Sequence, residues 1–197
     1  MTERSHPLPM LDASAGQPQA DASPARLRRI LDQHYDFVWR TVRFLGVAEA
    51  HADDAAQQVS CILARKLASV APGAELSFLF STATRVASEA RRAAKRRPAT
   101  AEGDAIDALE APLPSPEELA DQHRARRTLD QILDTLPEDL RVVFVLYEVN
   151  EMTLPEIAAL TGLTLGTATS RLRRAREAFQ AALRRRAAAA KNAGRTP

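Results

Sequence analysis

Residues 153–176 read TLPEIAALTGLTLGTATSRLRRAR, and this stretch decides the fold of the C-terminal part of the chain. Thr153 is suited to cap a helix whose first turn contains a proline and Glu156, both of which favour a helix N-terminus. Gly162 has the backbone freedom that ends this short helix, and Thr164 is suited to cap a second one. The stretch therefore predicts two helices joined by a tight turn.

The second helix of this pair, predicted over residues 165–186, has two chemically different faces. Apolar positions recur every three or four residues, as expected for one buried stripe: Leu165, Ala168, Leu172, Ala175, Phe179 and Leu183. A helix that enters a DNA major groove needs short polar groups near base edges and arginines for phosphates or guanine. The predicted DNA-binding residues are therefore the capping Thr164 and the residues on the side of the helix opposite the apolar stripe: Thr164, Thr167, Thr169, Ser170, Arg171, Arg173, Arg174 and Arg176. The alternative is an amphipathic hairpin with a solvated basic face.

The composition indicates an all-α protein made of two small helical domains. The chain has 197 residues, only 7 glycines and few β-branched runs. Its net charge is +2 and its sequence pI is about 9.0, but the charges are segregated. Basic residues cluster at 85–97 and 171–186, whereas residues 98–123 contain acids and no Lys or Arg. Local positive faces of this kind fit a polyanionic partner.

Several function classes find no support in the sequence. The single cysteine, Cys61, excludes an intramolecular disulfide and a cysteine-based zinc site, and its apolar surroundings favour a small core residue. Metal-ligand clusters, glycine-rich phosphate loops and nucleophile–base pairs are missing, so we expect no catalysis, no cofactor, no metal and no small-molecule substrate. No apolar run reaches membrane-spanning length and no secretory signal is recognisable, so we expect no membrane insertion and a cytoplasmic protein.

The order of composition along the chain predicts two domains with a linker between them. Residues 142–147, VVFVLY, could form a strand in isolation, but Pro137 before them and two acids in the first turn favour a helix over 138–148. The predicted segments are a disordered leader (1–23), a three-helix domain (24–97), an acidic, Pro-containing flexible linker (98–116), a four-helix domain (117–186) and a frayed tail (187–197).

Two polar surfaces of the first domain have competing explanations. The third helix ends in RRAAKRR at 91–97, and this many cations exceeds what a helix C-terminus requires, which favours phosphate binding. The second helix carries acids and amides on one side: Asp53, Asp54, Gln57 and Gln58. The helix dipole alone explains acids in a first turn, and a surface for a protein partner explains them equally well.

The chain resembles the extracytoplasmic-function (ECF) sigma factors of bacterial RNA polymerase, which retain only regions two and four of the sigma family. LPEDLRVVFVLYE (136–148) and the helix pair, with the GTxxSRL core at 166–172, are similar to region four. HADDAAQQV (51–59) resembles the region two helix that docks on the polymerase clamp. FLFSTATRVASEARR (78–92) resembles the segment that melts and reads the minus-ten element, with Arg85 in place of the usual Asn and Glu89 in place of Asp.

This resemblance implies transcription initiation as the function, with core RNA polymerase and promoter DNA as partners and an anti-sigma factor as a further candidate. The helix from 165 would read the minus-thirty-five element, where Thr169 replaces a common Lys. The polymerase-binding side would be Asp53, Asp54, Gln57 and Gln58, and the minus-ten residues would be Arg85, Glu89, Arg91, Arg92, Lys95 and Arg96. The alternatives are a polymerase-independent helix-turn-helix regulator and an adaptor that does not bind DNA.

Overall fold

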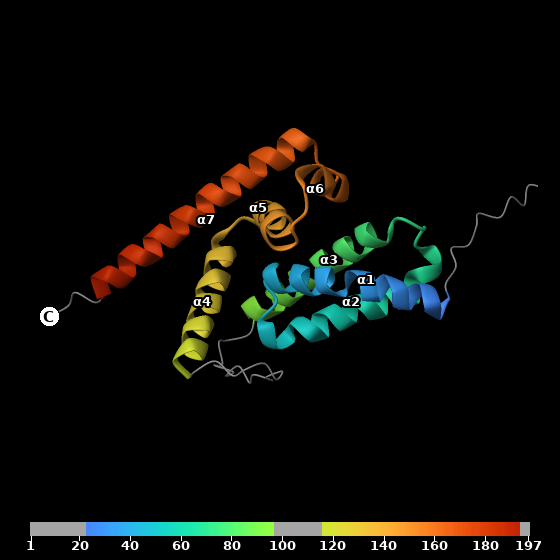
Figure 1. The fold of residues 1–197 in the computed structure, drawn as a ribbon, viewed down its shortest axis with the longest axis horizontal. Helices are drawn as coiled ribbons and strands as arrows, with labels where there is room; N and C mark the ends of the chain where they lie inside the picture. The colour runs from blue at the N-terminus through green and yellow to red at the C-terminus, as the bar shows by residue number, and fades with distance from the viewer. Residues whose placement is uncertain (1–22, 97–115, 194–197) are drawn as a thin grey trace, which may run out of the picture.

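The computed structural model describes residues 23–96 and 116–193, and these residues form helices and turns without a strand (Figure 1). The predicted all-α fold is thereby confirmed. Three predicted segments lie wholly or partly outside the described residues. They are the leader except for Ser23, the linker except for Pro116, and the last four residues of the tail. The helices are α1 (Pro24–Phe44), α2 (Ala52–Lys66), α3 (Glu75–Arg96), α4 (Pro116–Thr135), α5 (Glu138–Phe144), α6 (Leu154–Thr161) and α7 (Leu165–Ala193), with short turns η1 (Glu49–His51), η2 (Leu67–Ser69) and the π-helical η3 (Val145–Val149).

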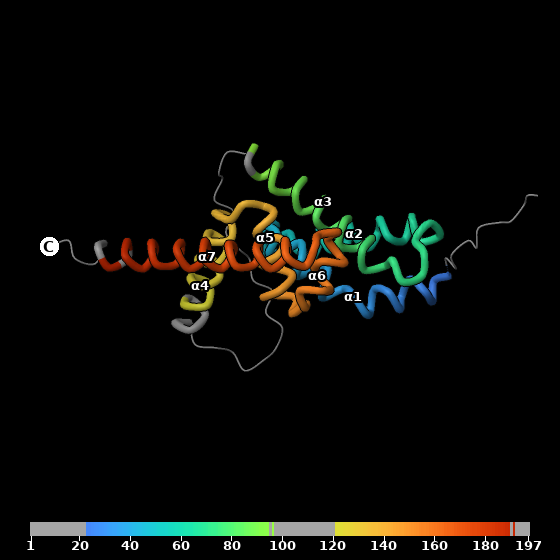
Figure 2. The backbone as a smooth tube through the Cα atoms, turned by 90° about the horizontal axis from the view of Figure 1, so that it is seen from above, coloured from blue at the N-terminus to red at the C-terminus, as the bar shows by residue number. Residues whose placement is uncertain are grey.

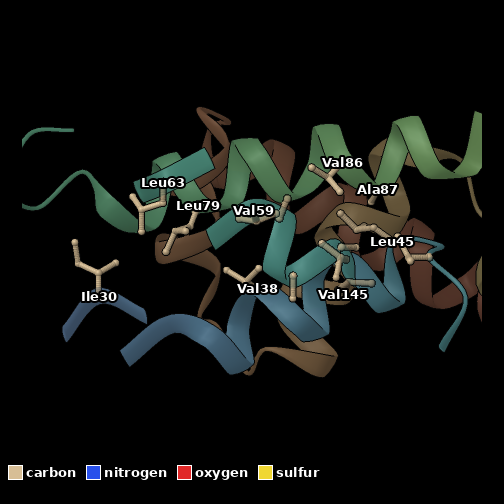
Figure 3. Close-up of a cluster of buried hydrophobic side chains, with 14 of the residues drawn as sticks. Ile30, Val38, Leu45, Val59, Leu63, Leu79, Val86, Ala87 and Val145 are labelled. Atoms are coloured by element: carbon tan, nitrogen blue, oxygen red, sulfur yellow. The ribbon is translucent and has the colours of Figure 1, made fainter. Parts of the chain in front are cut away.

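The first three helices pack pairwise around one apolar core (Figures 1 and 3). Ser23 begins α1, because its hydroxyl accepts a hydrogen bond from the Arg26 N–H at 3.2 Å and a proline occupies the first turn. The stripes of α1, α2 and α3 then meet at fully buried side chains such as Val42, Val59 and Leu79. This packing fixes which faces of α2 and α3 point outward.

Helices α4 to α7 form the second group, and α5 with η3 lies at its centre. Leu140 and Phe144 pack toward α4 and the middle of α7, while Leu146 packs toward α6 and the start of α7. Val145 faces the other way and belongs to the core of α1, α2 and α3. The run 142–147 is apolar at every position, and each of its side chains is buried or partly buried between the two cores.

Several positions differ from the sequence predictions. Leu165 and Leu183, expected in the buried stripe of α7, are 52% and 47% exposed, and at the second of these positions the neighbouring Ala182 is buried instead, at 4%. Cys61, expected in the core, is exposed on α2. Helix α7 does not end near Arg186 but continues to Ala193, and its C-terminal end extends beyond the other helices (Figure 2).

Candidate nucleic-acid interface

The turn between α6 and α7 is fixed by local hydrogen bonds. The N–H and hydroxyl of Thr153 donate to Glu156 Oε2 at 2.8 and 2.7 Å, and these bonds lower the pKa of Glu156. Gly162 takes a left-handed conformation with φ of 70° and its N–H donates to the Ala158 carbonyl. The Thr164 hydroxyl accepts from the Thr167 N–H at 3.2 Å and so caps α7. The predicted helix pair and each of its predicted caps are confirmed.

The inner faces of α6 and α7 seat the pair on α5 and η3. Ile157, Ala168 and Leu172 are buried against Val143 and Leu146. Farther along α7, Ala175 is buried and the ring of Phe179 stacks on that of Phe144 with a centroid distance of 5.0 Å. This seating leaves the opposite face of α7 toward solvent.

The predicted DNA-binding face of α7 is open along its length. Thr167 and Arg171 are partly exposed, and the remaining members of the predicted set are exposed: Thr164, Thr169, Ser170, Arg173, Arg174 and Arg176. The hydroxyls of Thr169 and Ser170 donate to backbone carbonyls of α7 at 2.8 and 3.0 Å, which fixes their orientation and leaves their oxygen lone pairs available. Short acceptors at the start of the helix are followed by guanidinium groups, which is the order that groove reading requires.

Carboxylates near the predicted DNA-binding face hold three of its arginines. The Arg176 Nε donates to Glu148 at 2.6 Å while the guanidinium lies 4.8 Å from the ring centroid of Tyr147. The hydrogen bond to Glu148 is the main reason that the pKa of Arg176 is raised. Arg171 Nε lies 3.4 Å from Asp139 Oδ2. Arg173 Nη1 lies 2.6 Å from Oε1 of Glu177, one turn farther along α7.

The sequence did not assign such a role to Asp139, because the helix dipole already explains an acid in a first turn, or to Glu148, whose partner Arg176 is 28 residues away in the sequence. Arg174 differs from its three neighbours, since the described residues supply it with no ion-pair or hydrogen-bond partner.

The predicted minus-ten residues of α3 do not share one environment. Arg85 and Glu89 are exposed and form an ion pair one turn apart at 3.5 Å, and Arg92 and Arg96 are exposed. The side chain of Lys95 lies outside the described residues. Arg91 is only 18% exposed and its Nη2 lies 2.9 Å from Glu138 of α5. The structure thus keeps Arg85, Arg92 and Arg96 available, whereas it turns Arg91 toward the second group of helices.

The predicted polymerase-binding residues form one continuous exposed face. Asp53, Asp54, Gln57 and Gln58 are all exposed along the first two turns of α2. Asp53 accepts a hydrogen bond from Trp39 Nε1 at 2.8 Å, which ties the start of α2 to α1. A shallow groove runs from Asp54 and both glutamines past Cys61 to Arg85 of α3. The faces predicted for polymerase and for minus-ten DNA therefore adjoin each other.

Within residues 23–96 and 116–193, His, Cys, Asp and Glu do not gather in any group of three or more that could hold a metal ion. In the same ranges, each helix is too short or too polar to cross a membrane.

Comparison with known proteins identifies the C-terminal group of helices. Residues 126–179 match the family described as sigma-70, region 4. These residues are similar to region 4 of that family. They include most of α4, all of α5 and α6, and the part of α7 that carries the predicted DNA-binding face.

Relatives of known name extend the comparison beyond the region 4 domain. The ECF RNA polymerase sigma factor SigE of Mycolicibacterium smegmatis is 28% identical over 148 residues, which are 75% of this chain. The ECF RNA polymerase sigma-E factor of Escherichia coli K12 is 33% identical over 110 residues, which are 52% of this chain. Each match spans 58% of the relative's own length. These relatives confirm the resemblance to ECF sigma factors that the sequence predicted.

Two solved structures share the fold. CnrH, solved in complex with the cytosolic domain of CnrY, aligns with a TM-score of 0.63 over 84% of this chain and 92% of that one, at 20% identity. The sigma factor RpoE from Bartonella quintana, solved with the anti-sigma factor NepR, aligns with a TM-score of 0.54 over 81% of this chain and 97% of that one, at 19% identity. At these identities the alignments establish the two-domain helical fold alone.

Proposed function

We propose that this protein is a bacterial sigma factor that binds core RNA polymerase and directs promoter-specific initiation of transcription. The observation that carries the proposal is the outward cationic face of α7, the second helix of a capped helix-turn-helix in the residues that match region 4. On this proposal the face of α7 reads the minus-thirty-five element in the major groove. Hydroxyls near the start of the helix contact base edges, and the arginines contact phosphates or guanine.

The first three helices supply the other two activities on this proposal. The acidic and amide face of α2 docks on core polymerase. Beside it, Arg85, Arg92 and Arg96 of α3 hold backbone phosphates of the melted minus-ten region, with salt-dependent affinity. Residues 24–97 and 117–186 then act as two weak readers on one chain, and their linkage raises the effective concentration of each.

The proposed protein performs no bond chemistry, since each assigned residue binds or orients a macromolecule. It needs no cofactor, and its partners place it in the cytoplasm. Because CnrH and RpoE were solved in complexes with CnrY and with the anti-sigma factor NepR, an anti-sigma factor is a further proposed partner. The alternative is a helix-turn-helix regulator that acts without polymerase. It would leave the exposed acidic and amide face of α2 without a binding partner.

In vitro transcription tests the proposal directly. Purified chain and core polymerase from the source bacterium are incubated with a library of genomic fragments, and the 5′ ends of the transcripts are sequenced. We expect new start sites that share two upstream elements and disappear without the chain. Binding of the chain to DNA without any polymerase-dependent start site would favour the alternative regulator.

Two variants test the division of labour. Arg171→Ala should weaken initiation at selected promoters by about tenfold or more, as loss of one good base or phosphate contact does, while core polymerase binding stays unchanged. Gln58→Ala should weaken core binding and leave binding of the isolated chain to promoter duplex intact. Equal loss of both activities in either variant would contradict the assignment of separate surfaces.

A further inference from the structure

The second half of α7 carries a separate group of cations, which we call the distal cations. They are Arg184, Arg185, Arg186 and Lys191, and all four side chains are exposed. Residues 178–193 contain no Asp or Glu. The match to region 4 ends at residue 179, so the distal cations lie beyond the part of α7 that the family describes.

This half of α7 is helical without a surface to cover it. The helix extends beyond the other helices of the chain (Figure 2). Ala182 is buried, whereas each described side chain after it in α7 is exposed. Residues 187–190 are all alanine, which has the highest helix propensity and so favours continuation of the helix. The distal cations are therefore held on a regular helix, and helix geometry gives the side on which each one lies.

Helix geometry places the distal cations in line with the predicted DNA-binding face. Eleven residues make about three turns, so a side chain recurs on nearly the same side of a helix eleven positions later. Arg173 and Arg174 recur in this way as Arg184 and Arg185, about 16 Å farther along the axis. Lys191 follows Arg184 by seven residues, or about two turns, and lies on the same side. The cationic side of α7 is thus repeated in its second half.

Stabilisation of the helix does not account for these arginines. The helix dipole acts within the last turn, and Lys191 is the basic residue in that turn. Arg184, Arg185 and Arg186 precede the end of α7 by seven to nine residues, or about 10–14 Å. Among the residues that the structure describes, none pairs a carboxylate with any of these three arginines, whereas Asp139, Glu177 and Glu148 pair with arginines of the first half.

The position of the distal cations fits DNA phosphates better than base edges. The major groove is about 12 Å wide. If Arg173 and Arg174 lie at the groove, side chains about 16 Å farther along the axis lie past its edge, where the duplex presents its backbone. A cation that binds a phosphate there releases condensed counterions, so its contribution to affinity falls with salt and does not depend on sequence.

We propose that the distal cations form a phosphate-binding surface that holds duplex DNA beside the groove in which the first half of α7 lies. This surface supplies affinity without sequence preference, whereas the hydroxyls and arginines of the first half supply the preference. The inference rests on the proposed DNA-binding role of α7. An acidic protein surface is the competing polyanion, and the alignment with the predicted DNA-binding face favours DNA.

Salt-dependent binding of the full chain to a mixed-sequence DNA duplex tests this surface without polymerase or promoter. The duplex carries a fluorescent label, and its affinity for the chain is measured by anisotropy over a series of salt concentrations. Arg184→Ala combined with Arg185→Ala removes two phosphate contacts. The slope of log affinity against log salt concentration should then become shallower by about 1.8, which corresponds to about 60-fold weaker binding at about 0.1 M salt.

Two further double variants are the controls. Arg28→Ala combined with Arg29→Ala removes the same charge from two exposed arginines of α1 and should keep the parental slope. Arg184→Lys combined with Arg185→Lys should also keep it, because an ammonium group binds a phosphate but does not reproduce the two-point contact of arginine with guanine. Alanine and lysine both favour helices, so these substitutions leave α7 helical.

The outcomes separate this surface from the proposed function. A parental slope for the α7 alanine pair, an equal loss in the α1 pair, or a loss in the lysine pair would overturn the proposal. Weaker binding to core polymerase with an unchanged salt slope would assign the surface to a protein partner and would overturn it as well. If the slope changes as expected but the chain initiates no transcription, the proposed function fails and the phosphate-binding surface stands.

Discussion

Replacement of Gly46 by alanine is the most discriminating perturbation of this fold. Gly46 ends the α1 turn with φ of +108°, a conformation that residues with a Cβ rarely adopt. An alanine Cβ at this position would lie 2.5 Å from Cδ of Arg91 and 2.9 Å from Nη1 of Arg141. Arg141 is 3% exposed and the Arg91 side chain is 18% exposed, so neither side chain can move away from the added Cβ without breaking contacts.

The expected cost has two parts. The backbone conformation alone costs roughly 1–3 kcal/mol for a residue with a side chain. The contact adds the displacement of Arg141, which lies 3.5 Å from the Leu45 carbonyl and 3.1 Å from Asp134, and the loss of such buried hydrogen bonds costs about 1–3 kcal/mol more. We therefore expect Gly46→Ala to lower the free energy of unfolding by about 4 kcal/mol.

Gly73 supplies the matched control. Its φ is +87°, but a Cβ built on it meets nothing within 4 Å, so Gly73→Ala carries the backbone cost alone. Equilibrium urea unfolding followed by circular dichroism should separate the two variants by about 2 kcal/mol, or about 1 M in midpoint for a slope of about 2 kcal/mol per M. Equal midpoints for the two variants would refute the claim that Gly46 is required by the close approach of Arg91 and Arg141.

Three further predictions concern other contacts. Thr153→Ala should cost about 1 kcal/mol in urea unfolding by removing the hydroxyl of the α6 cap, whereas Thr128→Ala, a non-capping hydroxyl on α4, should cost less than half of that. Burial raises the pKa of Glu75, but hydrogen bonds from Arg26 and from the Gly73 N–H lower it by more, so it lies below 4.5. The ionised Glu75 should therefore stabilise the fold fully above about pH 4.5, and this stabilisation should be lost as the pH falls through the pKa of Glu75 in the folded chain. The midpoint temperature of thermal unfolding should consequently fall less steeply with decreasing pH in Glu75→Gln than in the parent chain. Arg174→Ala should reduce by about one the slope of log affinity for promoter duplex against log salt concentration, and an unchanged slope would exclude a phosphate contact at Arg174.

The helix-turn-helix could be predicted in detail because its signals are local. Each helix cap depends on residues no more than four positions apart, so a single sequence contains the information. The capping residues are Thr153, Gly162 and Thr164. The stripe of α7 failed at Leu165 and Leu183 for a related reason. Periodicity does not state where the covering surface begins or which of two neighbouring residues it buries, and Ala182 is buried next to the exposed Leu183.

The buried arginines could not be predicted from the sequence. Arg26, Arg43 and Arg141 are 4%, 6% and 3% exposed, although charged residues are normally placed on the surface. Their partners are distant in sequence: Arg26 donates to the Val70 carbonyl at 2.7 Å and Arg43 to Asp130. Neither periodicity nor spacing identifies such pairs. Consequently, the interface between the two groups of helices was absent from the sequence-based interpretation.

The sequence nevertheless contained one sign of that interface. VVFVLY at 142–147 resembled a strand because it is apolar at every position, and helical periodicity could not assign it a solvent face. In the structure, Val142, Val145 and Val149 contact the core of α1–α3, whereas Val143 and Leu146 contact that of α6 and α7. Because each group of helices covers one side of this segment, neither group alone would bury all of its apolar side chains. An apolar run without a solvent face therefore predicts a second packing surface, although the run itself does not identify the helices that supply it.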